Sequence, residues 1–194
     1  MTLTTTDVLR VRPASRSIVI IGILVAAGCA AFAAINIWFE LTNRFDSGPH
    51  AADAAALSVV NWYVVAIKLV GVIVATLAIT PTTKLVSPRV IGILLWAGFA
   101  TLAVYVSGSM IQAVIIVAGI HPGTDHLDAA AIGYVLGFLL ASTGFGVLAV
   151  SFARRARLGR REFLLGMCGA PVILGSILLA LPSILRGAGL LSGA

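Results

Sequence analysis

Five long apolar stretches, each poor in charged residues, fill most of the chain and are separated by short polar segments. They cover about residues 17–39, 57–79, 90–117, 129–152 and 163–185. A membrane-spanning helix needs about 20 apolar residues, and each stretch reaches this length. Because backbone amides in lipid must bond within their own segment, the stretches should be helical and not an open sheet. The pattern therefore predicts an all-α bundle of five transmembrane helices.

The composition excludes a water-soluble fold. Hydrophobic residues make up 60% of the chain and charged residues 10%, whereas an ordinary soluble domain has about 25% charged residues. A chain of 194 residues leaves room for one compact unit. We predict a cytoplasmic tail over residues 1–16, a single membrane domain over 17–186 and a flexible outer tail over 187–194.

The charged residues between the apolar stretches are sorted by sign. Most of the 13 basic residues precede the first stretch or fall between the second and third or the fourth and fifth. Since basic residues gather on the cytoplasmic side, this places the N-terminus in the cytoplasm and the C-terminus outside, in the plasma membrane. The run of arginines over residues 154–161 is interpreted as a topological anchor, with an anionic-lipid patch as the alternative. No recognition motif or aromatic platform accompanies it, so nucleic acid is not an expected partner.

Glycine and proline predict how three of the helices bend and pack. The third stretch exceeds one crossing, so we expect either a tilted helix or a bend near Gly108. In the fifth stretch, Pro171 removes a backbone donor and should kink the helix. In the fourth, small residues recur every four positions, at Gly133, Gly137 and Ala141, a pattern typical of closely packed membrane helices. We expect an internal seam there, with a membrane-protein partner or a homo-oligomer contact as the alternative.

Lys68 lies near the middle of the second stretch and is the most costly residue to insert in a membrane. A central lysine costs about 2.5–3.5 kcal/mol, so it should face the bundle interior and find polar partners. Helical spacing places candidate partners in the outer half of the same helix and of neighbouring helices: Asn36, Glu40, Asn61, Tyr105, Ser109 and Gln112. We predict a polar pocket that opens outward, with Glu40 as a candidate acid and the others as binding residues. A purely structural polar clamp is the alternative.

The remaining chemically active side chains give weaker signals. All three histidines, His50, His121 and His126, fall in predicted outer segments, but their spacing matches no metal motif. They are weak candidates, and we predict no metal and no cofactor. The two cysteines, Cys29 and Cys168, form no CxxC pair, which argues against a thiol redox enzyme.

These features favour a noncatalytic or ligand-binding membrane component whose partners include membrane lipids. One alternative is an intramembrane enzyme that cyclises or isomerises a lipid or isoprenoid substrate, because such a reaction needs little more than one shielded carboxylic acid. Another is a subunit of a small transporter or export/resistance system with Lys68 in its path. Whether the protein is an enzyme stays open at this point.

Overall fold

The computed structural model describes residues 11–47, 51–80, 86–118 and 129–190. Within these ranges the chain is helical and contains no strand. Five helical segments of 25 to 30 residues are long and apolar enough to cross a membrane, which confirms the predicted all-α membrane architecture. The first four are single helices: α1 (Arg16–Leu41), α2 (Ala54–Ile79), α3 (Pro88–Val117) and α4 (Ala129–Ala156). Short 3₁₀ turns, Arg44–Asp46 and Ala51–Asp53, lie between α1 and α2.

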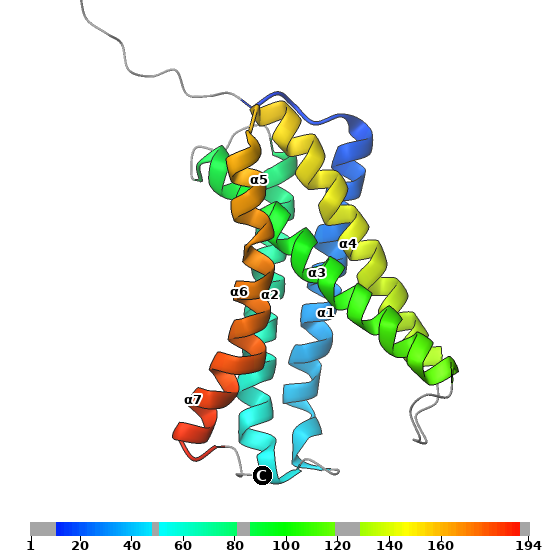
Figure 1. Ribbon diagram of the computed structural model, residues 1–194, viewed down its shortest axis with the longest axis vertical. Coiled ribbons are helices and arrows are strands. Elements are labelled where there is room, and N and C mark those ends of the chain that lie inside the picture. The colour runs from blue at the N-terminus through cyan, green and yellow to red at the C-terminus, as the bar shows by residue number, and fades with distance from the viewer. Residues whose placement is uncertain (1–10, 48–50, 81–85, 119–128, 191–194) are drawn as a thin grey trace, which may run out of the picture.

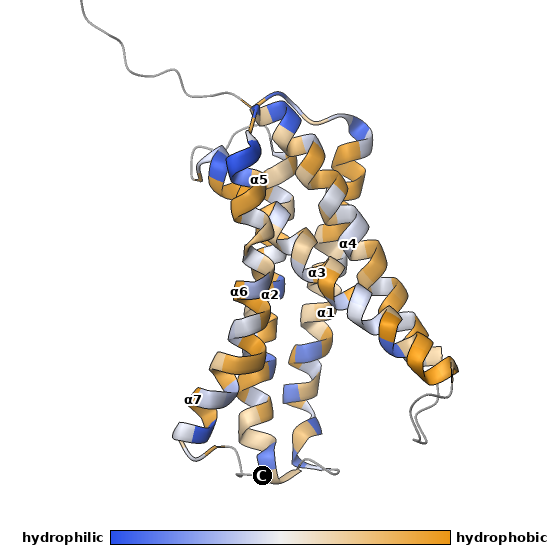
Figure 2. Ribbon diagram, viewed as in Figure 1, coloured by the Kyte–Doolittle hydropathy of each residue, from blue (hydrophilic) through white to orange (hydrophobic). Residues whose placement is uncertain are grey.

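The helices are arranged as two antiparallel pairs and one further segment. Figure 1 shows that the α1–α2 pair and the α3–α4 pair meet near one end of the molecule and diverge toward the other. The end where they meet, which we call the basic end, carries most of the arginines within the described ranges: Arg12, Arg16, Arg89, Arg154, Arg155, Arg157, Arg160 and Arg161. Figure 2 shows hydrophilic positions gathered there, and a second group on the opposite halves of α1 and α2. We call that opposite half of the molecule the far half.

The apolar core lies toward the basic end, where all four long helices meet. Its most completely buried large side chains are Ile91, Leu95, Leu148 and Phe152, from α3 and α4. Small residues allow the backbones to approach: a Cβ at Gly144 of α4 would collide with the Val25 side chain of α1. Packing of this kind holds membrane helices together, because lipid supplies no hydrophobic driving force between them.

α3 runs through Gly108 as one uninterrupted helix, so the chain is not broken there. Its 30 residues span about 45 Å, well over the roughly 30 Å hydrocarbon core. Figure 1 shows α3 crossing the molecule obliquely to α1 and α2. Nothing lies within 4 Å of a Cβ built on Gly108, so no neighbour forces a bend. The Ser109 hydroxyl donates to the Tyr105 carbonyl of the same helix, 3.0 Å away.

The fifth segment is not one uninterrupted α-helix but a series of short ones. It consists of α5 (Arg160–Met167), α6 (Gly169–Gly175), a π-helical turn (Ser176–Ala180) and α7 (Leu181–Gly187). The α-helical pattern breaks at Cys168, before Pro171, which has no N–H to offer the Met167 carbonyl. The π turn precedes Pro182 in the same way, with the Leu181 N–H bonded five residues back to Ser176. The sequence predicted the first irregularity but not the second.

α5 and α6 pack very closely against α3. A Cβ at Gly166 would collide with the Trp96 side chain and lie 2.8 Å from the Ile93 carbonyl oxygen. At Gly169 a Cβ would collide with Ala97. Only glycine fits at such a backbone approach, so these two residues fix the fifth segment to α3.

Candidate functional site

In the far half of the molecule, polar side chains of α1 and α2 form one continuous chain of hydrogen bonds. The Lys68 ammonium donates to Asn36 Oδ1 at 2.7 Å. The Asn36 amide donates in turn to Asn61 Oδ1 at 2.6 Å. Finally, the Asn61 amide donates to Glu40 Oε1 at 2.7 Å. We call these four residues the polar chain.

Helical geometry explains why these four side chains meet. Asn36 and Glu40 are four residues apart on α1, and Asn61 and Lys68 are seven apart on α2, so each pair shares one face of its helix. α1 and α2 pack along each other, which brings the two polar faces together. Each asparagine accepts through its oxygen and donates through its nitrogen, so all donors along the polar chain point from the ammonium toward the carboxylate.

Both ends of the polar chain have further partners. At one end, the Lys68 ammonium also donates to the Phe32 carbonyl at 3.2 Å and lies 5.6 Å from the centre of the Phe32 ring. At the other, Ser58 Oγ donates to Glu40 Oε2 at 2.8 Å. Sequence reasoning missed Ser58, although its position three residues before Asn61 places it on the same face of α2.

The polar chain is partly buried, and its buried atoms all have partners. Asn61 is buried, with 6% of its surface exposed, while Asn36, Glu40 and Lys68 are half-buried. In the described ranges, every buried side-chain nitrogen or oxygen has a hydrogen-bond partner. Both oxygens of Glu40 act as acceptors, from Ser58 and Asn61. The geometry therefore links α1 to α2, with both Glu40 oxygens bonded to side chains of α2.

The candidates from the third stretch lie on α3, outside the polar chain. No hydrogen bond within the described ranges joins Tyr105, Ser109 or Gln112 to it; Ser109 bonds to its own helix and Gln112 is exposed. Tyr105 instead contacts Phe138 of α4, with tilted rings whose centres are 4.6 Å apart. Phe138 in turn stacks on Phe32 at 5.4 Å. An aromatic row therefore separates Tyr105 from the Lys68 ammonium.

The small-residue stripe of α4 faces α1 for part of its length. A Cβ at Gly137 would lie 3.1 Å from Cζ of Phe32, whereas nothing lies within 4 Å of one at Gly133. Ala141 is half-buried. The seam continues at Gly144, which the pattern of four did not include. Toward the basic end, these residues thus pack within a single chain.

The predicted metal candidates His50, His121 and His126 lie outside the described residues. Among the residues that are described, no group of three His, Cys, Asp or Glu side chains could hold a metal ion.

The chain has no match among protein-family models, curated proteins or solved structures.

Proposed function

We propose that this protein is a noncatalytic component of the plasma membrane that binds a ligand or a membrane-protein partner through its far half, facing outward. The observation that carries the proposal is that both carboxylate oxygens of Glu40 accept hydrogen bonds from side chains of α2. A catalytic acid must instead donate a proton to a bound substrate. The arrangement supports a pairing and binding role and disfavours the acid-initiated cyclase or isomerase.

Partial exposure of the polar chain supports the binding role. Lys68, Asn36 and Glu40 are half-buried within helices that are apolar enough to cross a membrane. Charged groups at such a depth are costly against lipid and usually face a polar cavity or a partner. Water, a polar ligand or a partner helix should therefore cover their exposed sides.

The charge distribution supports an orientation with the basic end in the cytoplasm. Among the described residues outside the fifth segment, Arg44 is the basic residue that lies at the opposite end of α1 and α2. The positive-inside bias then places the N-terminus inside and the C-terminus outside. Ser47, beyond the end of α1, would face outward, and Arg160, at the start of α5, would face inward.

Cysteine labelling tests this orientation in whole cells. In a Cys29→Ser/Cys168→Ser background, we expect a membrane-impermeant maleimide to label Ser47→Cys in intact cells. Arg160→Cys should react only after the cells are permeabilised. Both positions are exposed in the structure, so a difference in labelling would report the side of the membrane on which each position lies. The opposite result would invert the proposed topology.

The stability of Glu40 variants tests the noncatalytic role. If Glu40 serves to hold α1 against α2, Glu40→Ala should lower the midpoint of thermal unfolding in mild detergent, because donors on Ser58 and Asn61 lose their acceptor. Asp46→Asn is the matched control, since it removes an exposed acidic charge near the same end of α1. A Glu40→Ala variant as stable as the parent would contradict the proposal and favour the enzyme, because catalytic groups are commonly not optimised for stability.

A further inference from the structure

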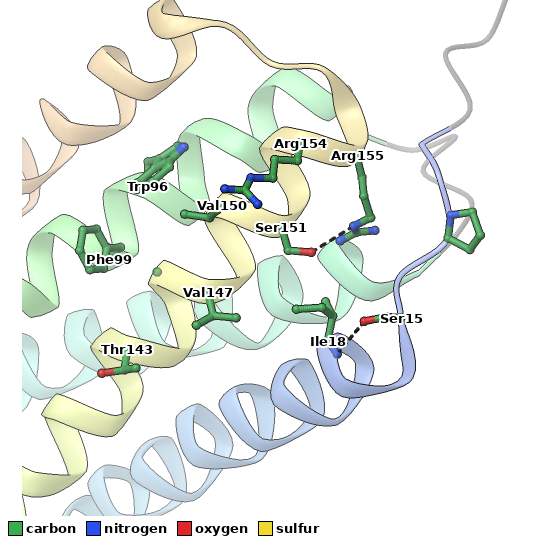
Figure 3. A pocket seen from close by; sticks show the side chains of 12 residues that line it. Ser15, Ile18, Trp96, Phe99, Thr143, Val147, Val150, Ser151, Arg154 and Arg155 are labelled. Atoms are coloured by element: carbon green, nitrogen blue, oxygen red, sulfur yellow. Dashed lines mark hydrogen bonds between the residues drawn. The ribbon is translucent and has the colours of Figure 1, made fainter.

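A groove of about 990 Å³ lies at the basic end, where α4 passes between α3 and the start of α1. Figure 3 shows Trp96 and Phe99 of α3 on one side of it, Ser15 and Ile18 on the other, and α4 side chains between them. None of the residues that line the groove belongs to the polar chain.

The body of the groove is apolar and runs lengthwise along α4. Thr143, Val147, Val150 and Arg154 contribute to its lining and recur at intervals of three or four residues, so they share one face of α4. From Thr143 to Arg154 the helix rises about 16 Å, which is roughly half of the 30 Å hydrocarbon core. The groove therefore has the length of one lipid leaflet, with its apolar part toward the centre of the membrane.

Two arginines lie at the end of the groove that would face the membrane surface, and they differ in their hydrogen bonding. Arg155 is fully engaged: it donates to the Ala78 carbonyl at 2.8 Å and the Arg12 carbonyl at 3.2 Å, and it lies 3.4 Å from Ser151 Oγ. Arg154 is exposed, and within the described ranges its guanidinium has no hydrogen-bond or ion-pair partner. Arg155 thus positions α4 against α2, while the charge of Arg154 stays available.

The surroundings of Arg154 favour a negatively charged occupant. Arg16, Arg157, Arg160 and Arg161 lie at the same end of the molecule. In the described part of this end, the acidic residue is Glu162, which already pairs with Arg89 at 3.6 Å and accepts the Gly159 N–H at 3.0 Å. The potential at the mouth of the groove is therefore positive.

We infer that this groove binds one anionic phospholipid. Its headgroup phosphate lies at Arg154, on the side of the groove that Trp96 and Val150 line, and one acyl chain lies along Val147, Val150 and Phe99. The apolar body and the charged mouth match the two parts of such a molecule, and guanidinium groups bind phosphate well. The inference does not depend on the noncatalytic role proposed for the far half.

Trp96 provides a reporter inside the groove. The full chain carrying Trp38→Phe and Trp62→Phe, so that Trp96 is its one remaining tryptophan, is reconstituted in phosphatidylcholine bilayers. A minor fraction of either brominated phosphatidylglycerol or brominated phosphatidylcholine is added, because bromine on the acyl chains quenches nearby indole fluorescence. We expect the anionic lipid to occupy the groove with an apparent preference of about five-fold, as one favourable charge contact at a membrane surface would give.

Matched variants separate the groove from general surface charge. Arg154→Gln should abolish the preference, whereas Arg161→Gln, which removes an exposed charge outside the groove, should retain it. Val150→Phe fills the apolar body and should reduce quenching by either lipid. The inference is overturned if the two lipids quench equally, if the preference survives Arg154→Gln, if Arg161→Gln removes it equally, or if Val150→Phe leaves quenching unchanged.

Discussion

The two halves of this bundle are held together by different interactions. Toward the basic end, α1 to α4 share one apolar core, and glycines let side chains of one helix rest on the backbone of another. In the far half, α1 and α2 are joined by hydrogen bonds between charged and amide side chains, while α3 and α4 lean away as a separate pair. Apolar packing therefore assembles the four helices toward the basic end, whereas in the far half polar contacts join α1 to α2. The difference separates a rigid scaffold from a half that can present polar groups.

The largest effect should come from removing the charge at one end of the polar chain. Lys68→Met leaves the Asn36 oxygen without its charged donor and Glu40 without a balancing charge. Removing one partner of a fully buried ion pair costs about 3–5 kcal/mol. Because these groups are half-buried and linked through amides, we expect a loss of about 2 kcal/mol, measured by unfolding in mild detergent.

A double-mutant cycle sharpens this prediction. If Lys68 and Glu40 are coupled through the two asparagines, Lys68→Met/Glu40→Gln should lose less stability than the sum of the single variants. The exposed Arg161→Met serves as the control for loss of a basic charge. Strict additivity would show that the two ends of the polar chain are independent.

The next largest effect should come from the scaffold half. Gly166→Ala places a methyl group against Trp96 and the Ile93 carbonyl, and overpacking of this kind costs about 1–3 kcal/mol. We expect a lower unfolding midpoint and weaker contact between α5 and α3, detectable as a changed emission of Trp96 in the single-tryptophan background. An unaltered midpoint would mean that the two helices are not in close contact.

The smallest effect should come from a glycine in the far half. Gly108 has nothing near its Cβ position, so Gly108→Ala should raise stability by at most about 1 kcal/mol through helix propensity alone. A glycine-to-alanine substitution would then raise stability at Gly108 in the far half and lower it at Gly166 toward the basic end. Destabilisation by Gly108→Ala would instead reveal a bend or a helix contact at this position.

The sequence predicted the helices better than it predicted which helices are neighbours. Apolar length identified five helical segments that are long and apolar enough to cross a membrane, and helical spacing placed Asn36 with Glu40 and Asn61 with Lys68. Tyr105, Ser109 and Gln112 lie in the far half of α3, but α3 leaves the α1–α2 pair in this half. Spacing along one helix carries no information about which helix lies beside it, so these candidates did not join the polar chain.

The sequence predicts a helix irregularity when a single residue causes it. It does not predict features that depend on contacts between helices. Pro171 lacks a backbone N–H, which the sequence alone reveals, and the helical pattern does break just before it. At Gly108 the glycine and serine neighbours suggested a bend, yet nothing in the fold forces one. Gly166 and Gly169 are three residues apart and escaped a search for spacing of four. The groove near Arg154 is assembled from three segments and leaves no pattern in any one of them.

The direction of hydrogen bonding in the polar chain has a mechanical consequence. Each of its side chains has a partner on the other helix, so sliding α2 past α1 by one residue would break several bonds at once. A slip of this kind has no intermediate register in which the bonds re-form. The α1–α2 pair must therefore translate and rotate as a single rod. The far half of the α3–α4 pair has no such hydrogen bonds to α1 or α2 among the described residues, and it meets α1 through the apolar contact of Phe32 with Gly137.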